Sequence, residues 1–140
     1  MNWVETNQNS IISWKPFFFI EIKKMGEEGQ VISCHTVDAW NHHIKKDKNK
    51  LIVVDFAASW CGPCKVIAPF VAELAKSMPH VTFLKVDVDE LKEIASDWEV
   101  EAMPTFLLLK NEKTVAKVVG AKKDELQQTI IKHSGNTSIS

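Results

Sequence analysis

Two cysteines, Cys61 and Cys64, lie three positions apart in the pentapeptide Trp-Cys-Gly-Pro-Cys at 60–64, directly after an apolar run at 51–57. Residues three apart in one turn of helix lie about 5–6 Å apart at Cα, within the range that a disulfide bridges. Two thiols that close and reopen a disulfide can exchange electrons with the disulfides of other proteins. The spacing therefore predicts thiol–disulfide exchange where a strand passes into a helix.

The two cysteines are expected to differ in role because they differ in position along the helix. Cys61 precedes or opens the helix, where unpaired backbone N–H groups and the positive end of the helix dipole favour a thiolate. We therefore predict that Cys61 is the nucleophile, with its sulfur reachable by a partner. Cys64, one turn further on, would resolve the mixed disulfide. Pro63 is tolerated in a first helical turn, and Gly62 leaves the approach to the sulfur open.

An acidic residue, Asp55, interrupts the apolar run that precedes the cysteines. A carboxylate inside an apolar strand should have a raised pKa, and Asp55 could then accept a proton from Cys64 directly or through a water. Lys85, in a second apolar run at 83–86, is the candidate charge partner. Two alternatives stay open: Asp55 at a solvent-facing strand end, and Lys85 as an ordinary exposed lysine.

Two further features, Met103-Pro104 and Trp60, each allow two interpretations. A proline at the start of an apolar strand can be an ordinary edge feature or a cis-proline in a tight bend. Only about 5–6% of X-Pro bonds in folded proteins are cis, so the sequence leaves the isomer of Pro104 open. Trp60 is either a core side chain or a flat contact surface for partners.

The main alternative to redox chemistry is half of a zinc site. A structural zinc needs about four ligands, and only Cys34 and His35 could supply the rest. Neighbouring side chains on a strand point to opposite faces, and a C-x-x-C beside a β-α-β pattern favours redox use, so we expect no metal. Cys34 is expected to be a small strand side chain, with a second redox role as the lesser alternative.

The chain has 140 residues, of which 45% are hydrophobic and 25% are charged, with a formal net charge of −1. These values are typical of one globular domain with short tails. Near-neutral charge and the absence of arginine argue against nucleic acid or an anionic membrane as the main partner. An odd number of cysteines argues against a secreted disulfide scaffold, and no apolar run reaches the roughly 18 residues of a membrane span. We expect a cytoplasmic protein.

Apolar patterns along the chain predict the order β-α-β-α-β-α-β-β-α. The expected strands are 31–35, 51–57, 81–88, 105–109 and 114–119, and the expected helices are 37–44, 61–78, 91–98 and 122–133. This order predicts an α/β fold with a mixed sheet of about five strands, in which parallel crossovers come first and an antiparallel hairpin follows. About four helices would cover both faces of the sheet.

Four segments of the chain together resemble the thioredoxin family, and more narrowly the plant cytosolic h-type thioredoxins. The segments are Phe56-Ala-Ala-Ser-Trp-Cys-Gly-Pro-Cys-Lys65, Lys85-Val-Asp-Val-Asp89, Met103-Pro-Thr-Phe106 and Val119-Gly-Ala121. The resemblance covers about residues 28–134 and implies a thioredoxin fold for that domain. Residues 1–24 have no counterpart in the family, and Met25 is a natural start for it. We expect a poorly ordered extension over 1–27 and a flexible tail over 135–140.

The resemblance also implies roles for individual residues. Cys61 would attack a target disulfide and Cys64 would resolve the intermediate. Asp55 would be the buried carboxylate that assists proton transfer, with Lys85 nearby. The implied substrate-binding residues are Trp60, Gly62, Pro63, Met103, Pro104 and Gly120.

Three of these substrate-binding residues have more specific implied roles. Pro104 would be a cis-proline that faces the disulfide, and backbone near Met103 would pair with an extended substrate segment. Gly120 would let a partner approach closely. The chain departs from the family at the link Asn111-Glu112, which lacks the glycine often present there, so the hairpin turn is a place where its structure could differ.

The implied function is that of a protein disulfide reductase that maintains the thiol redox state of the cell. Such a protein would hold no bound cofactor and would receive electrons from NADPH through a thioredoxin reductase. It would pass them to target proteins with reducible disulfides, for example peroxiredoxin-like ones, and we expect a monomer. One alternative is a redox-independent binding module or holdase, motivated by the aromatic residues of the extension. Another is an oxidase or isomerase of the same fold, against which the Gly-Pro dipeptide argues.

Overall fold

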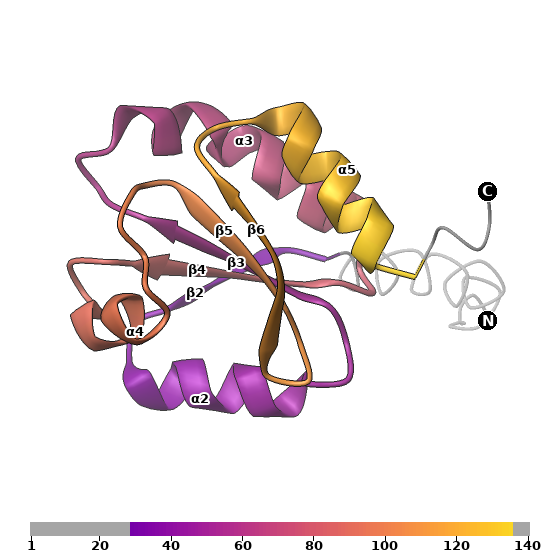
Figure 1. Ribbon diagram of the computed structural model, residues 1–140, viewed down its shortest axis with the longest axis horizontal. Coiled ribbons are helices and arrows are strands. Elements are labelled where there is room, and N and C mark those ends of the chain that lie inside the picture. The colour runs from indigo at the N-terminus through magenta and orange to yellow at the C-terminus, as the bar shows by residue number, and fades with distance from the viewer. Residues whose placement is uncertain (1–28, 136–140) are drawn as a thin grey trace, which may run out of the picture.

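The computed structural model describes residues 29–135, so the expectations for the extension at 1–27 and for the tail after Gly135 lie outside the described residues. The elements are, in order, β2 (Val31–Cys34), α2 (Val37–Lys46), β3 (Ile52–Ala57), α3 (Gly62–Ser77), β4 (Thr82–Asp87), α4 (Lys92–Asp97), β5 (Thr105–Lys110), β6 (Lys113–Val119) and α5 (Lys123–His133). This order confirms the predicted alternation of strands and helices (Figure 1). No helix in this part of the chain is long and apolar enough to cross a membrane.

The strands form one five-stranded sheet in the order β2-β4-β3-β5-β6. β2 and β3 pair with β4 in parallel, whereas β5 pairs with β3, and β6 with β5, in antiparallel fashion. α3 and α5 cover one face of the sheet, and α2 and α4 cover the other (Figure 1). β3 is buried along its whole length because helices cover both of its faces. The predicted mixed sheet between two helical layers is therefore confirmed.

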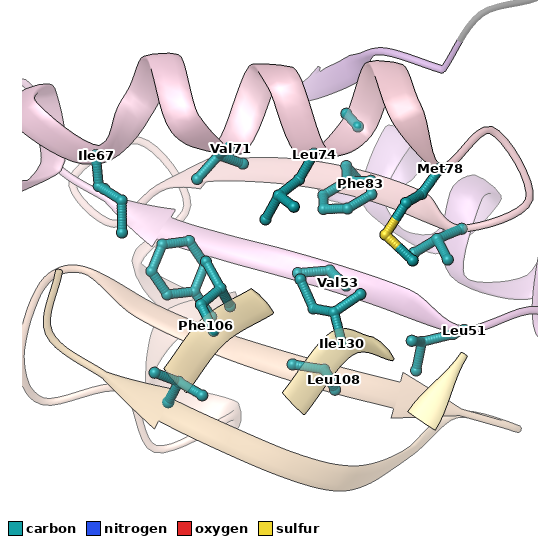
Figure 2. Packing of buried hydrophobic residues seen from close by; sticks show 14 residues of the cluster. Leu51, Val53, Ile67, Val71, Leu74, Met78, Phe83, Phe106, Leu108 and Ile130 are labelled. Atoms are coloured by element: carbon teal, nitrogen blue, oxygen red, sulfur yellow. The ribbon is translucent and has the colours of Figure 1, made fainter. Parts of the chain in front are cut away.

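Side chains of the central strand alternate between two hydrophobic clusters, one on each face of the sheet. Val53 packs in the cluster beneath α3, together with Ile67 of that helix (Figure 2). Val54 packs in the opposite cluster. Asp55 follows Val53 by two positions, so its side chain lies on the face that α3 covers. The strand thus directs a carboxyl group towards the helix that carries Cys64.

The hairpin between β5 and β6 turns without a glycine. Asn111 and Glu112 form a two-residue link, and their φ angles are 54° and 64°. Positive φ at both central residues is the mark of a type I′ turn, in which glycine is preferred. The backbone therefore adopts the conformation that the missing glycine would favour, and Glu112 adopts it against the preference of an L side chain.

Candidate active site

A disulfide joins Cys61 and Cys64 where β3 passes into α3, with the two Cα atoms 5.3 Å apart. Cys61 is the N-cap of α3, and its Sγ accepts a hydrogen bond from the backbone N–H of Cys64 at 3.2 Å. Pro63 occupies the first turn, where a missing N–H costs nothing. The predicted pairing of the thiols and the predicted place of Cys61 at the helix start are both confirmed.

The pair lies deeper than the sequence suggests. Cys61 is only 4% exposed and Cys64 only 6%, because they pack with Ala58 and Met103 in a small cluster of their own. Trp60 beside them is 66% exposed. That a partner can reach the sulfur of Cys61 stays a prediction, and this burial adds a condition to it: the partner has to fit closely against the rim of the site.

The indole of Trp60 stands on the surface in a fixed position. Its Nε1 donates a hydrogen bond of 2.8 Å to Oδ2 of Asp89. Asp89 is held in turn by Asp87, whose Oδ1 accepts hydrogen bonds from the backbone N–H groups of Asp89 at 2.8 Å and Glu90 at 3.3 Å. The exposure of Trp60 therefore excludes the core side chain, and its use as a contact surface for partners stays a prediction.

The loop that leads into β5 closes over the other side of the disulfide. The Met103–Pro104 peptide bond is cis, and the carbonyl oxygen of Met103 lies 3.6 Å from Sγ of Cys61. Gly120, at the end of β6, donates its N–H to the carbonyl oxygen of Pro104 at 2.8 Å and has a φ of 101°. The structure thus brings three of the implied substrate-binding residues together beside the disulfide, and it decides the isomer that the sequence leaves open.

Asp55 is buried at 5% exposure, which excludes the solvent-facing alternative. Burial raises the pKa of Asp55 to about 6, and the positive charge of Lys85 offsets part of this rise. Oδ1 of Asp55 is buried without a hydrogen-bond partner. Lys85 is half-buried and lies directly beside Asp55 in the parallel register of β3 and β4. This site therefore holds a carboxyl group that can take up or release a proton close to neutral pH.

A cavity of about 730 Å³ lies between the first half of α3 and the ends of β2 and β4. Cys64 and Lys65 line it from the helix, and Lys85 lines it from the sheet. The cavity is large enough to hold several waters, and a few charged side chains in its mostly apolar lining, such as Lys85, offer them hydrogen-bond partners. The cavity therefore connects Cys64 with Lys85, the neighbour of Asp55 in the sheet.

A family model described as Thioredoxin matches residues 31–132. The chain belongs to the thioredoxin family. It is 74% identical to thioredoxin H-type 2 of Nicotiana tabacum over 116 residues, which cover 81% of this chain and 98% of the relative. It is 65% identical to thioredoxin H1 of Arabidopsis thaliana over 109 residues, which cover 76% of this chain and 96% of the relative.

Solved structures agree with these relatives. The crystal structure of a thioredoxin from Nicotiana alata is similar to this chain with a TM-score of 0.74 and 51% identity, over 76% of this chain and 95% of that one. A poplar thioredoxin h is similar with a TM-score of 0.72 and 40% identity, over 74% and 96% of the two chains. The predicted thioredoxin fold and h-type resemblance are confirmed. This thioredoxin is a protein disulfide reductase that acts by dithiol–disulfide exchange through Cys61 and Cys64.

The third cysteine of this thioredoxin, Cys34, is not bonded to either cysteine of the redox pair. Cys34 is 1% exposed and packs with Trp40 in the cluster on the opposite face of the sheet from Asp55. Burial raises the pKa of the Cys34 thiol, which keeps it protonated and unreactive at neutral pH. Across residues 29–135, no three side chains of His, Cys, Asp or Glu gather where a metal ion could bind.

Sequence reasoning missed one residue of the site. Asp89 appears within a family-like segment, yet nothing in its spacing assigns it to the pair of cysteines. The hydrogen bond to Trp60 spans 29 positions of the chain, so only the tertiary fold brings the two residues together. An aspartate two positions after the end of a parallel strand is a weak signal for such a role, because loops at this edge of a sheet are often acidic or polar.

Proposed function

We propose that Cys61 and Cys64 divide the exchange between them. In the reduced protein, the Cys61 thiolate attacks one sulfur of a target disulfide, forms a mixed disulfide and releases the other target sulfur as a thiolate. Cys64 then attacks Sγ of Cys61, releases the second target thiol and closes the Cys61–Cys64 disulfide. Two electrons pass from the dithiol to the target. The N–H donor 3.2 Å from Sγ of Cys61 supports this assignment, because it stabilises negative charge on that sulfur.

We assign proton transfer during resolution to Asp55. Cys64 has to lose its proton to attack, and a base with a pKa near the working pH accepts a proton most effectively. The pKa of Asp55, raised to about 6 by burial, meets that condition. Lys85 would assist by limiting the rise of this pKa. The cavity shared by Cys64 and Lys85 supports a route through water.

The surface around the disulfide would bind an extended segment of the target. It comprises Trp60, Gly62, Pro63, Met103, Pro104 and Gly120. Backbone at Met103, beside the cis-proline, would pair with the target chain by strand addition, and Gly120 offers no side chain that would block it. The exposed indole of Trp60 would cover the target from the other side.

Electrons would come from NADPH through a thioredoxin reductase, and no bound cofactor is needed because the two thiols themselves carry the electrons. Targets would be proteins with reducible disulfides, including peroxiredoxin-like ones; a similar solved chain is described as part of a thiol-resolving mechanism in a yeast 1-Cys peroxiredoxin. The protein would act as a cytoplasmic monomer, with residues 28–134 as its thioredoxin domain. Its similarity to plant h-type thioredoxins supports these assignments.

The observation that carries this proposal is the disulfide between Cys61, at the start of α3, and Cys64 one turn further on. Reduction of insulin disulfides by wild type, Cys61→Ser and Cys64→Ser tests it. Both variants should lose turnover, and only Cys64→Ser should accumulate a mixed disulfide with insulin, visible by mass spectrometry. Cys34→Ser is the matched control and should keep full activity. Equal activity of Cys61→Ser and wild type would refute the assignment.

A further inference from the structure

One exposed apolar side chain near the redox site has no role in the exchange as described above. Val66 of α3 is 68% exposed, slightly more than Trp60 at 66%, and the other large apolar side chains described as exposed reach at most 43%. A single exposed valine needs no explanation by itself. Its position along α3 is what makes it informative.

α3 presents two different apolar faces. Ile67, Val71 and Leu74 point into the core beneath the helix (Figure 2). Pro63, Val66 and Phe70 follow one another at intervals of three and four residues, which places them along one side of the helix, at the edge of that inward face. We name these three residues the α3 ridge. It runs for about 10 Å from the first turn of the helix, given a rise of about 1.5 Å per residue.

The last residue of the α3 ridge, Phe70, lies beside the neighbouring helix α5. Nζ of Lys123, the first residue of α5, lies 5.8 Å from the centre of the Phe70 ring. α3 and α5 lie side by side on the same face of the sheet (Figure 1). Phe70 is half-buried against the core beneath these helices. The ridge is therefore a fixed surface, with its first residue at the disulfide and its last held in the groove between two helices.

We propose that the α3 ridge is part of the surface that binds protein targets, and that it selects targets with an apolar side chain within about 10 Å of the disulfide being reduced. This inference rests on the proposed function of the Cys61–Cys64 pair. The argument is continuity: Pro63 already borders the disulfide, and Val66 is the next exposed apolar side chain on the same side of the helix. A small disulfide reaches Cys61 without covering Val66. A protein that docks on the rim extends across it, and burial of Val66 would then add to affinity.

The test compares a protein disulfide with a small one. Pre-reduced protein is mixed either with insulin or with 5,5′-dithiobis(2-nitrobenzoate), and the second-order rate of its oxidation is measured after acid quench and thiol alkylation. For Val66→Lys, the ratio of the insulin rate to the small-disulfide rate should fall by about tenfold, the loss expected when one buried valine contact becomes a buried lysine. Val66→Ala should lower the ratio by about threefold.

The matched control is Val115→Lys. Val115 is a 43% exposed valine on β6 and lies outside the redox site and the α3 ridge, so this variant should keep the wild-type ratio. An unchanged ratio in Val66→Lys, or an equal loss with both disulfides, overturns the inference while leaving the proposed function intact. Failure of the proposed function itself would give a different result: Cys61→Ser would then be oxidised by both disulfides as fast as wild type.

Discussion

Asp55 and Lys85 occupy the same position in the parallel register of β3 and β4, on the face of the sheet that α3 covers. The strand pairing alone thus sets a buried carboxyl group beside a lysine, although 30 positions separate them in the chain. Burial dominates the outcome, since it raises the pKa of Asp55 to about 6 despite the nearby positive charge. Burial of this carboxyl group thus carries a cost in stability at neutral pH, and in the proposed function the same group accepts a proton.

Replacing Asp55 should change how stability depends on pH. The pKa of Asp55 is about 6 in the folded protein and about 4 in an unfolded chain, so between these values the folded protein holds one more proton. The free energy of unfolding therefore falls as pH rises through this range. Above about pH 6 the folded protein carries the full cost of a buried, ionised carboxylate, about 2–3 kcal/mol. Asp55→Asn never ionises. The difference in free energy of unfolding, variant minus wild type, should therefore be larger at pH 7 than at pH 4 by about 2–3 kcal/mol.

Urea denaturation of the disulfide form at the two pH values measures this difference. Comparing the variant with wild type at each pH cancels any constant effect of the new amide group. A difference that is the same at pH 4 and pH 7 would show that the carboxyl group is not perturbed by folding.

Replacing Lys85 should move the pH dependence of activity. Lys85→Met removes the charge that favours the Asp55 carboxylate, so the pKa of Asp55 should rise further. The lower midpoint of the pH–rate profile for insulin reduction should move upward, and turnover at pH 6 should fall by about two- to fivefold. Lys92→Met changes an exposed lysine on α4 and should leave the midpoint in place. A downward shift in Lys85→Met would contradict the assigned roles.

Releasing Trp60 from Asp89 should weaken target binding without altering the chemistry of the cysteines. Asp89→Ala removes the acceptor of the 2.8 Å hydrogen bond, which contributes about 0.5–1.5 kcal/mol to holding the indole. KM for insulin should rise by about two- to fivefold while the redox potential stays constant. The indole N–H resonance of Trp60 in an NMR spectrum should shift. Asp97→Ala, at an exposed acid on α4, should change neither property.

Gly29 should prove necessary for stability although it lies before the first described strand. A Cβ at this position would overlap the carbonyl oxygen of Ala75 in α3 and lie 3.1 Å from Cα of Pro79. Both obstacles are backbone atoms, which cannot rotate away. Gly29→Ala should lower the free energy of unfolding by about 1–3 kcal/mol in urea.

Gly62 is the matched control for this glycine. A Cβ at Gly62 meets nothing within 4 Å, and the residue lies in the first turn of α3. Gly62→Ala should leave stability equal or raise it by less than about 1 kcal/mol. A loss of stability in Gly62→Ala as large as that in Gly29→Ala would mean that crowding at Ala75 is not the cause.

Most of the fold was predictable because its signals are local. The apolar run at 51–57 identifies a strand with both faces covered, and β3 is buried throughout. The spacing of Cys61 and Cys64 identifies a pair that one helical turn can bridge, and the two are bonded. The depth of Cys61 could not be predicted, because Met103 comes from a distant part of the chain to pack against it beside the neighbouring Ala58.

The sequence by itself determined the chemistry of this protein: two thiols one turn apart at a helix start, and a carboxyl group in the strand before them. Short-range geometry is enough for that, because helix periodicity and strand alternation depend on neighbours in the chain. Only the tertiary structure decided which side chains and backbone groups surround the two cysteines and the carboxyl group. It paired Asp55 with Lys85, joined Trp60 to Asp89 and closed the cis Met103–Pro104 bond over Cys61. Those relationships depend on burial and on contacts between distant segments, and such contacts exist only once the sheet has formed.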